Sequence, residues 1–547
     1  MKEIATDILV IGGGLAGCHA ALRARELGHR VVIVEKQHIM HSGEACMGLK
    51  DFFALIPGIG DKAKEMENQR RATQGLMEEY FTELILDGSF EGIERLERWG
   101  IRVRNDKGEL VYDSSMFWTC NVYIWEGASL KRNLAKTCIK HGIKVINRVM
   151  VTDFLVEEGR VIGAVGFNTR EGELYIFRAK ATILSTGGCT RLYQSASGEN
   201  YNRWRNPYLT GDGYAASLRA GAALKHMEFV QGTLVPKDFS APGINAFIGV
   251  GAKLLNSRGE RFMGRYSGEQ MERAPRQLLA HAVFTEIKEG RGPIFLDFRG
   301  LPQEKYGILE RGFRNEKPIY ANYLAQRGVD LRGDLLEIEV SEPYIRGMAT
   351  GGLVIDKDFQ STLPGLFAMG DVTAYSSFYS AMGAMVLGWV GGERACSYAE
   401  GLKEVPQASD KTLDPLLERL QAPLLRKEGT PPEFIERNLQ RIMSSYAQYE
   451  RNEVGLTIGL ERVRALNSFA RDGIKASDPY ELVKAHEALN MLEIAEPVIM
   501  AARARKESRM FLNHRRTDYP QRDDEHFKVH IILRRRGEEL ELSFQKV

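Results

Sequence analysis

The chain has 547 residues, enough for two to four domains of roughly 100–200 residues each. Its 74 basic and 72 acidic residues leave a net charge of +2, too little to attract nucleic acid or an anionic membrane strongly. No apolar run reaches the roughly 18 residues that a membrane-spanning helix needs, and we expect no targeting segment. The six cysteines form no C-x-x-C pair, which predicts no metal or cluster site in this chain and a reducing, cytoplasmic location.

The N-terminal part predicts a strand, a helix and a second strand. Residues 6–11, which end in Ile-Leu-Val-Ile, predict a short buried strand, residues 16–27 have helical character, and residues 31–34 are β-branched and apolar. This βαβ order is the context in which a glycine motif between the first strand and the helix binds a dinucleotide.

Three glycines and one acid make up that motif. Gly12 permits a tight turn, Gly14 lets the backbone approach a pyrophosphate, and Gly17 allows the helix to pack closely on the strand. Glu35, about 20 residues further on, is placed to accept hydrogen bonds from ribose hydroxyls and disfavours a 2′-phosphate. The motif predicts dinucleotide binding, but it does not choose between FAD and NAD.

Further segments favour FAD. Residues 41–48 form a small glycine-rich loop suited to lying under an isoalloxazine ring, residues 179–188 read as a strand entering a glycine turn, and Asp371 ends an apolar strand where it can reach a ribityl hydroxyl. The predicted cofactor-binding residues outside the first motif are Lys36, Ser42, Gly43, Met47, Gly48, Val151, Thr186, Gly187, Asp212, Gly370 and Asp371.

Five stretches carry a resemblance to a known family. They are the N-terminal βαβ unit, TGDGYAASLRAGAALKHMEFVQ (210–231), LLNSRGERFMGRY (254–266), LPGLFAMGDV (363–372) and ESRMFLNHRRTDYPQRDDE (507–525). In this order they resemble the flavoprotein subunits of fumarate reductase and succinate dehydrogenase, a family that includes L-aspartate oxidase and the adenylylsulfate reductase alpha subunit. The loop 41–49 and the run 163–170 resemble the adenylylsulfate reductase branch in particular.

The resemblance implies an α/β fold: a split, Rossmann-like FAD-binding domain, an inserted α+β capping domain and a C-terminal helical domain. The expected bounds are 1–232 and 344–405 for the two parts of the FAD-binding domain, 233–343 for the capping domain, 406–510 for the helical domain and 511–547 for a C-terminal segment. The alternation within 529–544 predicts a hairpin in that last segment.

The family's catalytic positions are only partly matched. Arg276 stands where the family has its proton-transferring arginine, and Arg346 and Tyr379 lie beside family active-site segments. Glu126, in an aromatic-rich stretch, is a further candidate. The family's dicarboxylate-binding residues are missing from 232–234, 248–251, 347–352 and 381–384, so neither fumarate nor succinate is the expected substrate. Lys237 stands where a sulfonucleotide pocket would need an arginine, so adenylylsulfate is not the expected substrate either.

The leading hypothesis is an FAD-dependent oxidoreductase subunit that transfers a hydride or two electrons between flavin N5 and a small molecule. The resemblance implies a ferredoxin-like iron–sulfur partner. Two alternatives stay open: a self-contained enzyme that uses NAD(P)H or oxygen, and a non-catalytic electron-relay subunit. We expect noncovalent FAD, although His41 lies in the loop where some relatives attach the flavin.

Overall fold

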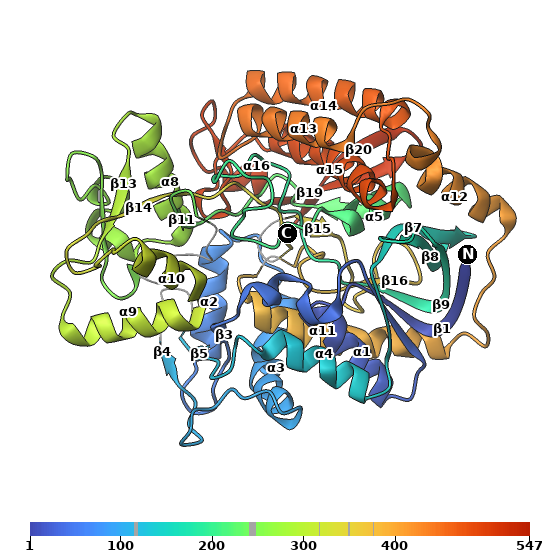
Figure 1. Ribbon diagram of the computed structural model, residues 1–547, viewed down its shortest axis with the longest axis horizontal. Coiled ribbons are helices and arrows are strands. Elements are labelled where there is room, and N and C mark those ends of the chain that lie inside the picture. Colours follow the sequence, from blue (N-terminus) through green and yellow to red (C-terminus); the bar gives the residue numbers. More distant parts are fainter. Residues whose placement is uncertain (114–118, 240–247, 317, 348–350, 376) are drawn as a thin grey trace.

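A computed structural model describes residues 1–547 except 114–118, 240–247, 317, 348–350 and 376. Three parts are visible in Figure 1: a sheet flanked by helices, a smaller lobe built from the middle of the chain, and a layer of long helices from the C-terminal part.

The largest sheet contains strands from both ends of the expected FAD-binding domain. Its order is β6-β2-β1-β9-β8-β7, and β16 pairs with β9. The strands β1, β2, β9 and β16 run parallel, and their buried residues are mostly apolar, with Val and Ile concentrated in β1 and β2, as in strands covered on both faces. The bounds are β1 (Lys2–Ile11), β2 (Val31–Glu35), β6 (Lys144–Asn147), β7 (Val149–Glu157), β8 (Arg160–Asn168), β9 (Leu174–Leu184) and β16 (Leu366–Ala368). Because β16 comes from far along the chain, the domain is split in sequence, as expected.

Helix α1 (Leu15–Glu26) packs against α11 (Ser380–Glu400) on this sheet. The contact is close because α11 presents glycine: a Cβ added at Gly388 would lie 2.5 Å from the carbonyl oxygen of Ala16. The neighbouring elements are α2 (Lys62–Ala72), α3 (Glu79–Arg98), α4 (Leu130–Lys140) and the small sheet of β3 (Asp51–Phe53), β5 (Asn121–Tyr123) and β4 (Tyr112–Asp113).

The inserted segment forms the lobe at the left of Figure 1 and has its own apolar cluster, which includes Leu254, Leu296 and Phe298. Its antiparallel sheet has the order β11-β14-β13-β12. The bounds are β11 (Leu234–Pro236), β12 (Lys253–Leu255), β13 (Ile294–Asp297), β14 (Leu336–Val340), α7 (Gly264–Ser267), α8 (Arg276–Lys288), α9 (Gln303–Glu316) and α10 (Pro318–Gln326). The chain enters and leaves this lobe side by side, since Gln231 and Tyr344 pair as an antiparallel bridge.

The C-terminal helices lie across the top of Figure 1. They are α12 (Asp410–Leu425), α13 (Pro432–Tyr446), α14 (Glu453–Gly473) and α15 (Pro479–Ala504). The expected terminal hairpin is present, but it is not a separate appendage: it extends a sheet of the FAD-binding domain in the order β15-β10-β19-β20. These strands are β10 (Ala223–Lys225), β15 (Gly352–Leu353), β19 (Val529–Arg536) and β20 (Glu539–Lys546). Shorter elements are α5 (Asp212–Arg219), β17 (Glu450–Arg451), β18 (Arg515–Arg516) and α16 (Asp524–Phe527).

Candidate active site

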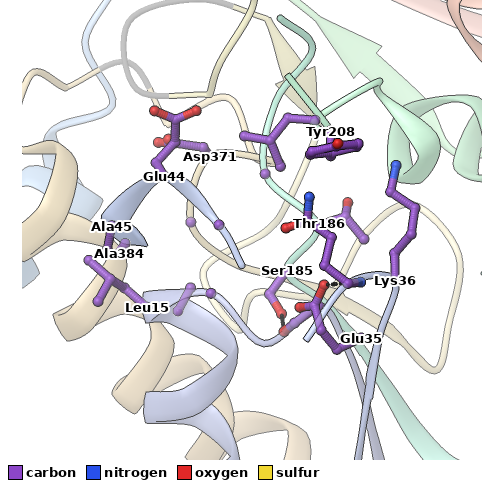
Figure 2. A pocket seen from close by; sticks show the side chains of 18 of the residues that line it. Leu15, Glu35, Lys36, Glu44, Ala45, Ser185, Thr186, Tyr208, Asp371 and Ala384 are labelled. Carbon is purple, nitrogen blue, oxygen red and sulfur yellow. Dashed lines mark hydrogen bonds between the residues drawn. The ribbon is translucent and has the colours of Figure 1, made fainter. Parts of the chain in front are cut away.

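A pocket lies at the carboxyl ends of β1, β2 and β9, the edge where open parallel sheets bind ligands. Figure 2 shows Leu15, Ala45 and Ala384 on one side of the pocket and Lys36 and Tyr208 on the other. The predicted cofactor-binding residues that line it are Gly12, Gly14, Glu35, Lys36, Gly43, Gly48, Val151, Thr186, Gly187, Asp212, Gly370 and Asp371. Segments that are up to 359 positions apart in the chain (371 − 12) therefore meet in one cavity.

The first two glycines of the motif keep the turn at the sheet edge narrow. Gly12 has φ +98°, a conformation that favours glycine, and a Cβ there would lie 2.5 Å from the carbonyl oxygen of Ser185. Gly14 begins α1, whose free N–H groups suit a diphosphate. Gly17 does not line the pocket, but a Cβ there would lie 2.0 Å from the carbonyl oxygen of Gly12.

The carboxylate of Glu35 is fixed at the end of β2. It accepts a hydrogen bond from the backbone N–H of Gly13 at 2.7 Å and from that of Gln37 at 2.9 Å. Both contacts hold the side chain at the pocket wall, in the position expected of a ribose-binding acid.

Two buried polar atoms at the pocket fit a ligand rich in hydroxyl and phosphate groups. Neither the hydroxyl oxygen of Thr186 nor Oδ1 of Asp371 has a hydrogen-bond partner among the described residues. Buried polar atoms are normally paired, so these two call for partners from a ligand. Together with the glycine turn and Glu35, they fit FAD.

Lys36 lines the pocket and is held there by two buried carboxylates. Its ammonium lies 2.7 Å from Asp212 and 2.9 Å from Glu487 and donates to the hydroxyl of Thr210 at 3.1 Å. Burial by itself would lower the pKa of Lys36, but Asp212 and Glu487 raise it above its ordinary value. The protein carboxylates thus neutralise the charge of Lys36, and its side chain forms part of the pocket wall.

The loop 41–48 contributes only some of its predicted residues. Gly43 and Gly48, with φ +74° and +102°, line the pocket, whereas Ser42 is buried and Met47 half-buried outside the lining. His41 is exposed and is also absent from the lining. This placement favours noncovalent FAD.

Arg276 begins helix α8 of the inserted lobe. Its Nη2 donates to the side-chain oxygen of Gln231 at 3.4 Å, and no described carboxylate forms an ion pair with it. Burial lowers the pKa of Arg276; Arg346 and Arg205 lower it further, and Tyr344 opposes them. The group is a desolvated cation, which is easier to deprotonate than one in water.

Arg346 lies beside the pocket but is not among the residues that line it. It is buried, it donates to the hydroxyl of Ser380, and its Nε is 3.9 Å from the carboxylate of Asp371. Both partners line the pocket. The residues that follow it, 348–350, belong to the family segment without its histidine and lie outside the described residues.

Two catalytic candidates occupy structural positions. Tyr379 is 1% exposed, stacks on Phe53 with ring centroids 4.1 Å apart and donates to Glu65 at 2.7 Å. Burial, followed by Glu65, raises the pKa of Tyr379 far above its ordinary value. Glu126 is exposed and absent from the pocket lining. Neither position supports contact with a substrate at this pocket, because the hydroxyl of Tyr379 is bonded to buried Glu65 and Glu126 is exposed away from the lining.

Sequence reasoning missed Arg205. This residue lines the pocket, pairs with Glu44 at 2.7 Å and donates to the hydroxyl of Tyr344 at 3.2 Å. Its guanidinium stacks on Trp204, 3.9 Å from the ring centroid. One sequence feature could have indicated Arg205: it lies in an aromatic- and arginine-rich loop between the glycine turn at 187 and the helix that starts at 212.

No group of three or more His, Cys, Asp or Glu side chains in the described part of the chain is arranged to hold a metal ion. Within the same residues, no helix combines the length and the apolar character needed to cross a membrane. All six cysteines are unpaired.

The chain matches the model of an FAD binding domain over residues 7–386 and that of the fumarate reductase flavoprotein C-terminal region over 436–547. It is 30% identical to one of the subunits of the fumarate reductase (CoM/CoB) of Methanothermobacter marburgensis, with 97% of each chain covered. It is 29% identical to an uncharacterised FAD-dependent oxidoreductase of Methanocaldococcus jannaschii, over 97% of this chain and 96% of that one.

Among solved structures, adenylylsulfate reductase of Archaeoglobus fulgidus is similar with a TM-score of 0.90 and 25% identity, over 100% of this chain and 96% of that one. This confirms the likeness to that branch. The first family model alone covers more than half of the sequence. The chain therefore belongs to the fumarate reductase and succinate dehydrogenase flavoprotein family, and it is an FAD-dependent oxidoreductase.

Proposed function

We propose that this chain binds FAD noncovalently and exchanges two electrons with a small anionic substrate at the edge of the pocket. The observation that carries the proposal is Arg276, a desolvated guanidinium with no carboxylate partner among the described residues, close to Arg346 and Arg205 at the FAD site. When bound, FAD supplies the two-electron chemistry at its N5.

The protein's own residues would then bind the substrate and move a proton. Arg346 and Arg205 hold positive charge at the pocket edge, which attracts an anion and keeps the pKa of Arg276 below its ordinary value. Reduction of a double bond by two electrons also needs a proton, and Arg276 is the group placed to supply it.

Electrons would reach or leave the chain through a separate ferredoxin-like iron–sulfur subunit in the cytoplasm. The relative from Methanothermobacter marburgensis is named as one subunit of a larger enzyme, and this supports a partner. An absorption spectrum of the protein purified without oxygen from its host tests the idea. A broad iron–sulfur shoulder beside the flavin bands supports it, whereas flavin bands alone, with rapid bleaching by NADH, support a self-contained enzyme instead.

Replacing Arg276 tests the catalytic part. In FAD-loaded protein, Arg276→Ala should lower kcat by about 100- to 10,000-fold, the usual contribution of a general acid, while the flavin spectrum stays unchanged. Reduced methyl viologen serves as the electron donor, and fumarate, crotonate and adenylylsulfate are tried as acceptors. Arg273→Ala, at an exposed position just before α8, is the matched control. Unchanged turnover in Arg276→Ala contradicts the assignment.

A further inference from the structure

A chain of hydrogen bonds joins Arg205 of the FAD-binding domain to Arg276 of the inserted lobe. Nη2 of Arg205 donates to the hydroxyl of Tyr344 at 3.2 Å, and this hydroxyl donates to the side-chain oxygen of Gln231 at 3.1 Å. The same oxygen accepts from Arg276 at 3.4 Å. Gln231 and Tyr344 form the bridge where the chain enters and leaves the lobe, and we call this place the hinge of the lobe. The hydrogen bonds therefore fix both arginines at the hinge.

Three buried N–H donors at this hinge have no acceptor among the described residues. They are Nε2 of Gln231, Nε of Arg205 and Nε1 of Trp204. The orientation of the Gln231 amide follows from chemistry: Arg276 can only donate, so the oxygen must face it and the nitrogen is left over. Gln231 is 1% exposed and Trp204 7% exposed, so bulk water has little access to these donors and does not replace the missing acceptors. Donors of this kind are costly to leave unpaired, and a ligand that supplies only acceptors would satisfy them.

The charges around the hinge favour a single negative charge on that ligand. Arg205 has Glu44 at 2.7 Å, and Arg346 has Asp371 at 3.9 Å, but Arg276 has no described carboxylate. Arg205 and Arg276, the two guanidinium groups of the hinge, therefore have one carboxylate between them among the described residues, which leaves one positive charge in excess. A monoanion would neutralise it, whereas a dianion would leave a buried negative charge without a partner.

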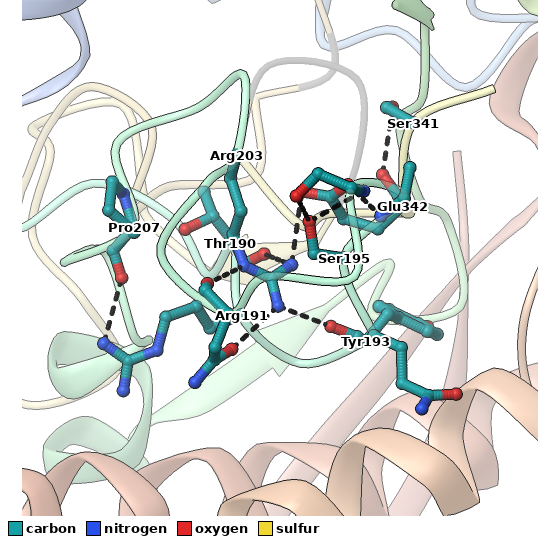
Figure 3. A network of polar contacts seen from close by, with 12 residues as sticks. Thr190, Arg191, Tyr193, Ser195, Arg203, Pro207, Ser341 and Glu342 are labelled. Atoms are coloured by element: carbon teal, nitrogen blue, oxygen red, sulfur yellow. Dashed lines mark hydrogen bonds and ion pairs between the residues drawn. The ribbon is translucent and has the colours of Figure 1, made fainter. Parts of the chain in front are cut away.

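The loop that carries Trp204 and Arg205 is held rigidly. Figure 3 shows Arg203 at the centre of a polar network within this loop. Its guanidinium donates to the carbonyl oxygens of Tyr193 at 2.8 Å and Thr190 at 3.1 Å, and it lies 3.2 Å from the carboxylate of Glu342, two residues before Tyr344. The loop and the exit from the lobe are thus fixed to one another, so the donors are ordered before a ligand arrives.

We propose that Arg205, Gln231, Trp204 and Arg276 form a seat for one monoanionic oxyanion group, a carboxylate or a sulfonate, on an otherwise neutral substrate. This inference rests on the proposed function and narrows its substrate class. Arg205 and Trp204 come from a loop outside the five stretches that carry the family resemblance, so the seat is built differently from a two-carboxylate grip. Arg205 is the specificity-determining residue of the seat, and Tyr344 positions it.

Ligand binding to the FAD-loaded holoprotein tests the seat, with the flavin absorbance as the signal. Crotonate and ethenesulfonate represent the two monoanions, fumarate the dianion, and crotonamide the neutral analogue of crotonate. We expect one of the two monoanions to bind at least about tenfold more tightly than crotonamide, because the amide lacks the charge-assisted hydrogen bonds. Fumarate should bind no more tightly than that monoanion.

The variants then assign the effect to residues. Arg205→Gln should weaken binding of the preferred monoanion by about 10- to 100-fold and leave crotonamide unchanged, since a hydrogen bond to a charged group is lost. Trp204→Phe, which removes one donor but keeps the ring, should weaken it a few-fold. Arg273→Gln makes the same charge change at an exposed position and should have no effect.

The proposal is overturned if neither monoanion gives a saturable change, if fumarate or crotonamide binds most tightly, or if Arg205→Gln leaves the monoanion affinity unchanged. FAD content and reduction of the flavin by methyl viologen are measured on every preparation. If these are retained while the discrimination fails, only the seat is wrong; if FAD is absent or cannot be reduced, the proposed function itself fails.

Discussion

Gly17 keeps helix α1 close to the sheet beside the cofactor pocket. In addition to the contact with Gly12, a Cβ at this position would lie 2.5 Å from the hydroxyl of Ser185, so Gly17→Ala must push α1 away from the sheet. We expect FAD affinity to fall by about 5- to 150-fold, the equivalent of the roughly 1–3 kcal/mol that overpacking usually costs. A fluorescence titration of the apoprotein with FAD measures this.

The matched control is Gly307→Ala in helix α9, where an added Cβ meets no atom within 4 Å. Alanine is the better helix former, so this variant should keep its FAD affinity and melt no earlier than the parent. Equal affinities for the Gly17 and Gly307 variants would contradict the packing argument.

The sequence predicted those site residues whose position depends on local order. Glu35 is the last residue of a strand, and Gly12, Thr186 and Asp371 closely follow strands. The ends of these parallel strands meet at one edge of the sheet. Arg205 could not be found in this way, because its place depends on how a loop packs against Tyr344. The same limit applies to Tyr379, which lies beside a family segment but turns into the core.

At the scale of elements, helix α15 connects the C-terminal part to the pocket. One face of the helix carries Glu487, Asn490 and Glu493, spaced by three residues, and these side chains bond Lys36, Asp212 and Arg219 respectively. Since Lys36 and Asp212 line the pocket, the helix supports the wall against which the cofactor lies.

Glu487→Gln tests this support. The variant leaves Lys36 and Arg191 with one buried carboxylate fewer, because Glu487 lies 2.9 Å from the first and 2.8 Å from the second. Breaking a buried pair in this way should reduce the free energy of unfolding by about 3 kcal/mol and weaken FAD binding. Glu496 lies on the same helix as Glu487 and forms a partly exposed ion pair with Arg464 of α14. Glu496→Gln removes this pair and should change the melting temperature and the FAD affinity little. Equal effects of the two substitutions would rule out a special role for Glu487.

The family resemblance was sufficient to expect a helical domain over 406–510, and the structure has α12 at Asp410–Leu425 and α13 at Pro432–Tyr446 in this range. It could not reveal the docking of these helices. The buried ion pair of Arg191 with Glu436, for example, joins residues that are 245 positions apart, and no local pattern marks such partners.

At the scale of the whole molecule, buried histidines make stability depend on pH. Burial is the main cause that lowers the pKa of His486 and His281 to about 4 and that of His19 and His530 to about 3. The unfolded chain binds protons at these residues near pH 6.5, so it takes up more protons than the folded one as the pH falls toward 4. The folded state should therefore lose about 1.4 kcal/mol per histidine for each pH unit below 6.5.

Melting curves at pH 7.5 and pH 5.5 check this, and the lower pH should give the lower melting temperature. The carboxylates with lowered pKa, such as Glu286 at about 2, lose their stabilising contribution only at more acid pH. A melting temperature that rises on acidification between these two values would show that the histidines are charged in the folded protein.

The pairing of β10 with β19 sets the order in which the molecule can be assembled. Leu224 of β10 has Leu533 of β19 as its neighbour, and the last strand, β20, ends at Lys546. A ribosome synthesises the chain from its N-terminus, so the edge of β10 stays uncovered until residues 529–536 of β19 have been made. Glu487, which neutralises Lys36 at the pocket wall, is also made long after Lys36 itself. The complete cofactor pocket therefore forms only after α15 has been made, and a chain that terminates before β19 leaves an open sheet edge for chaperones to cover.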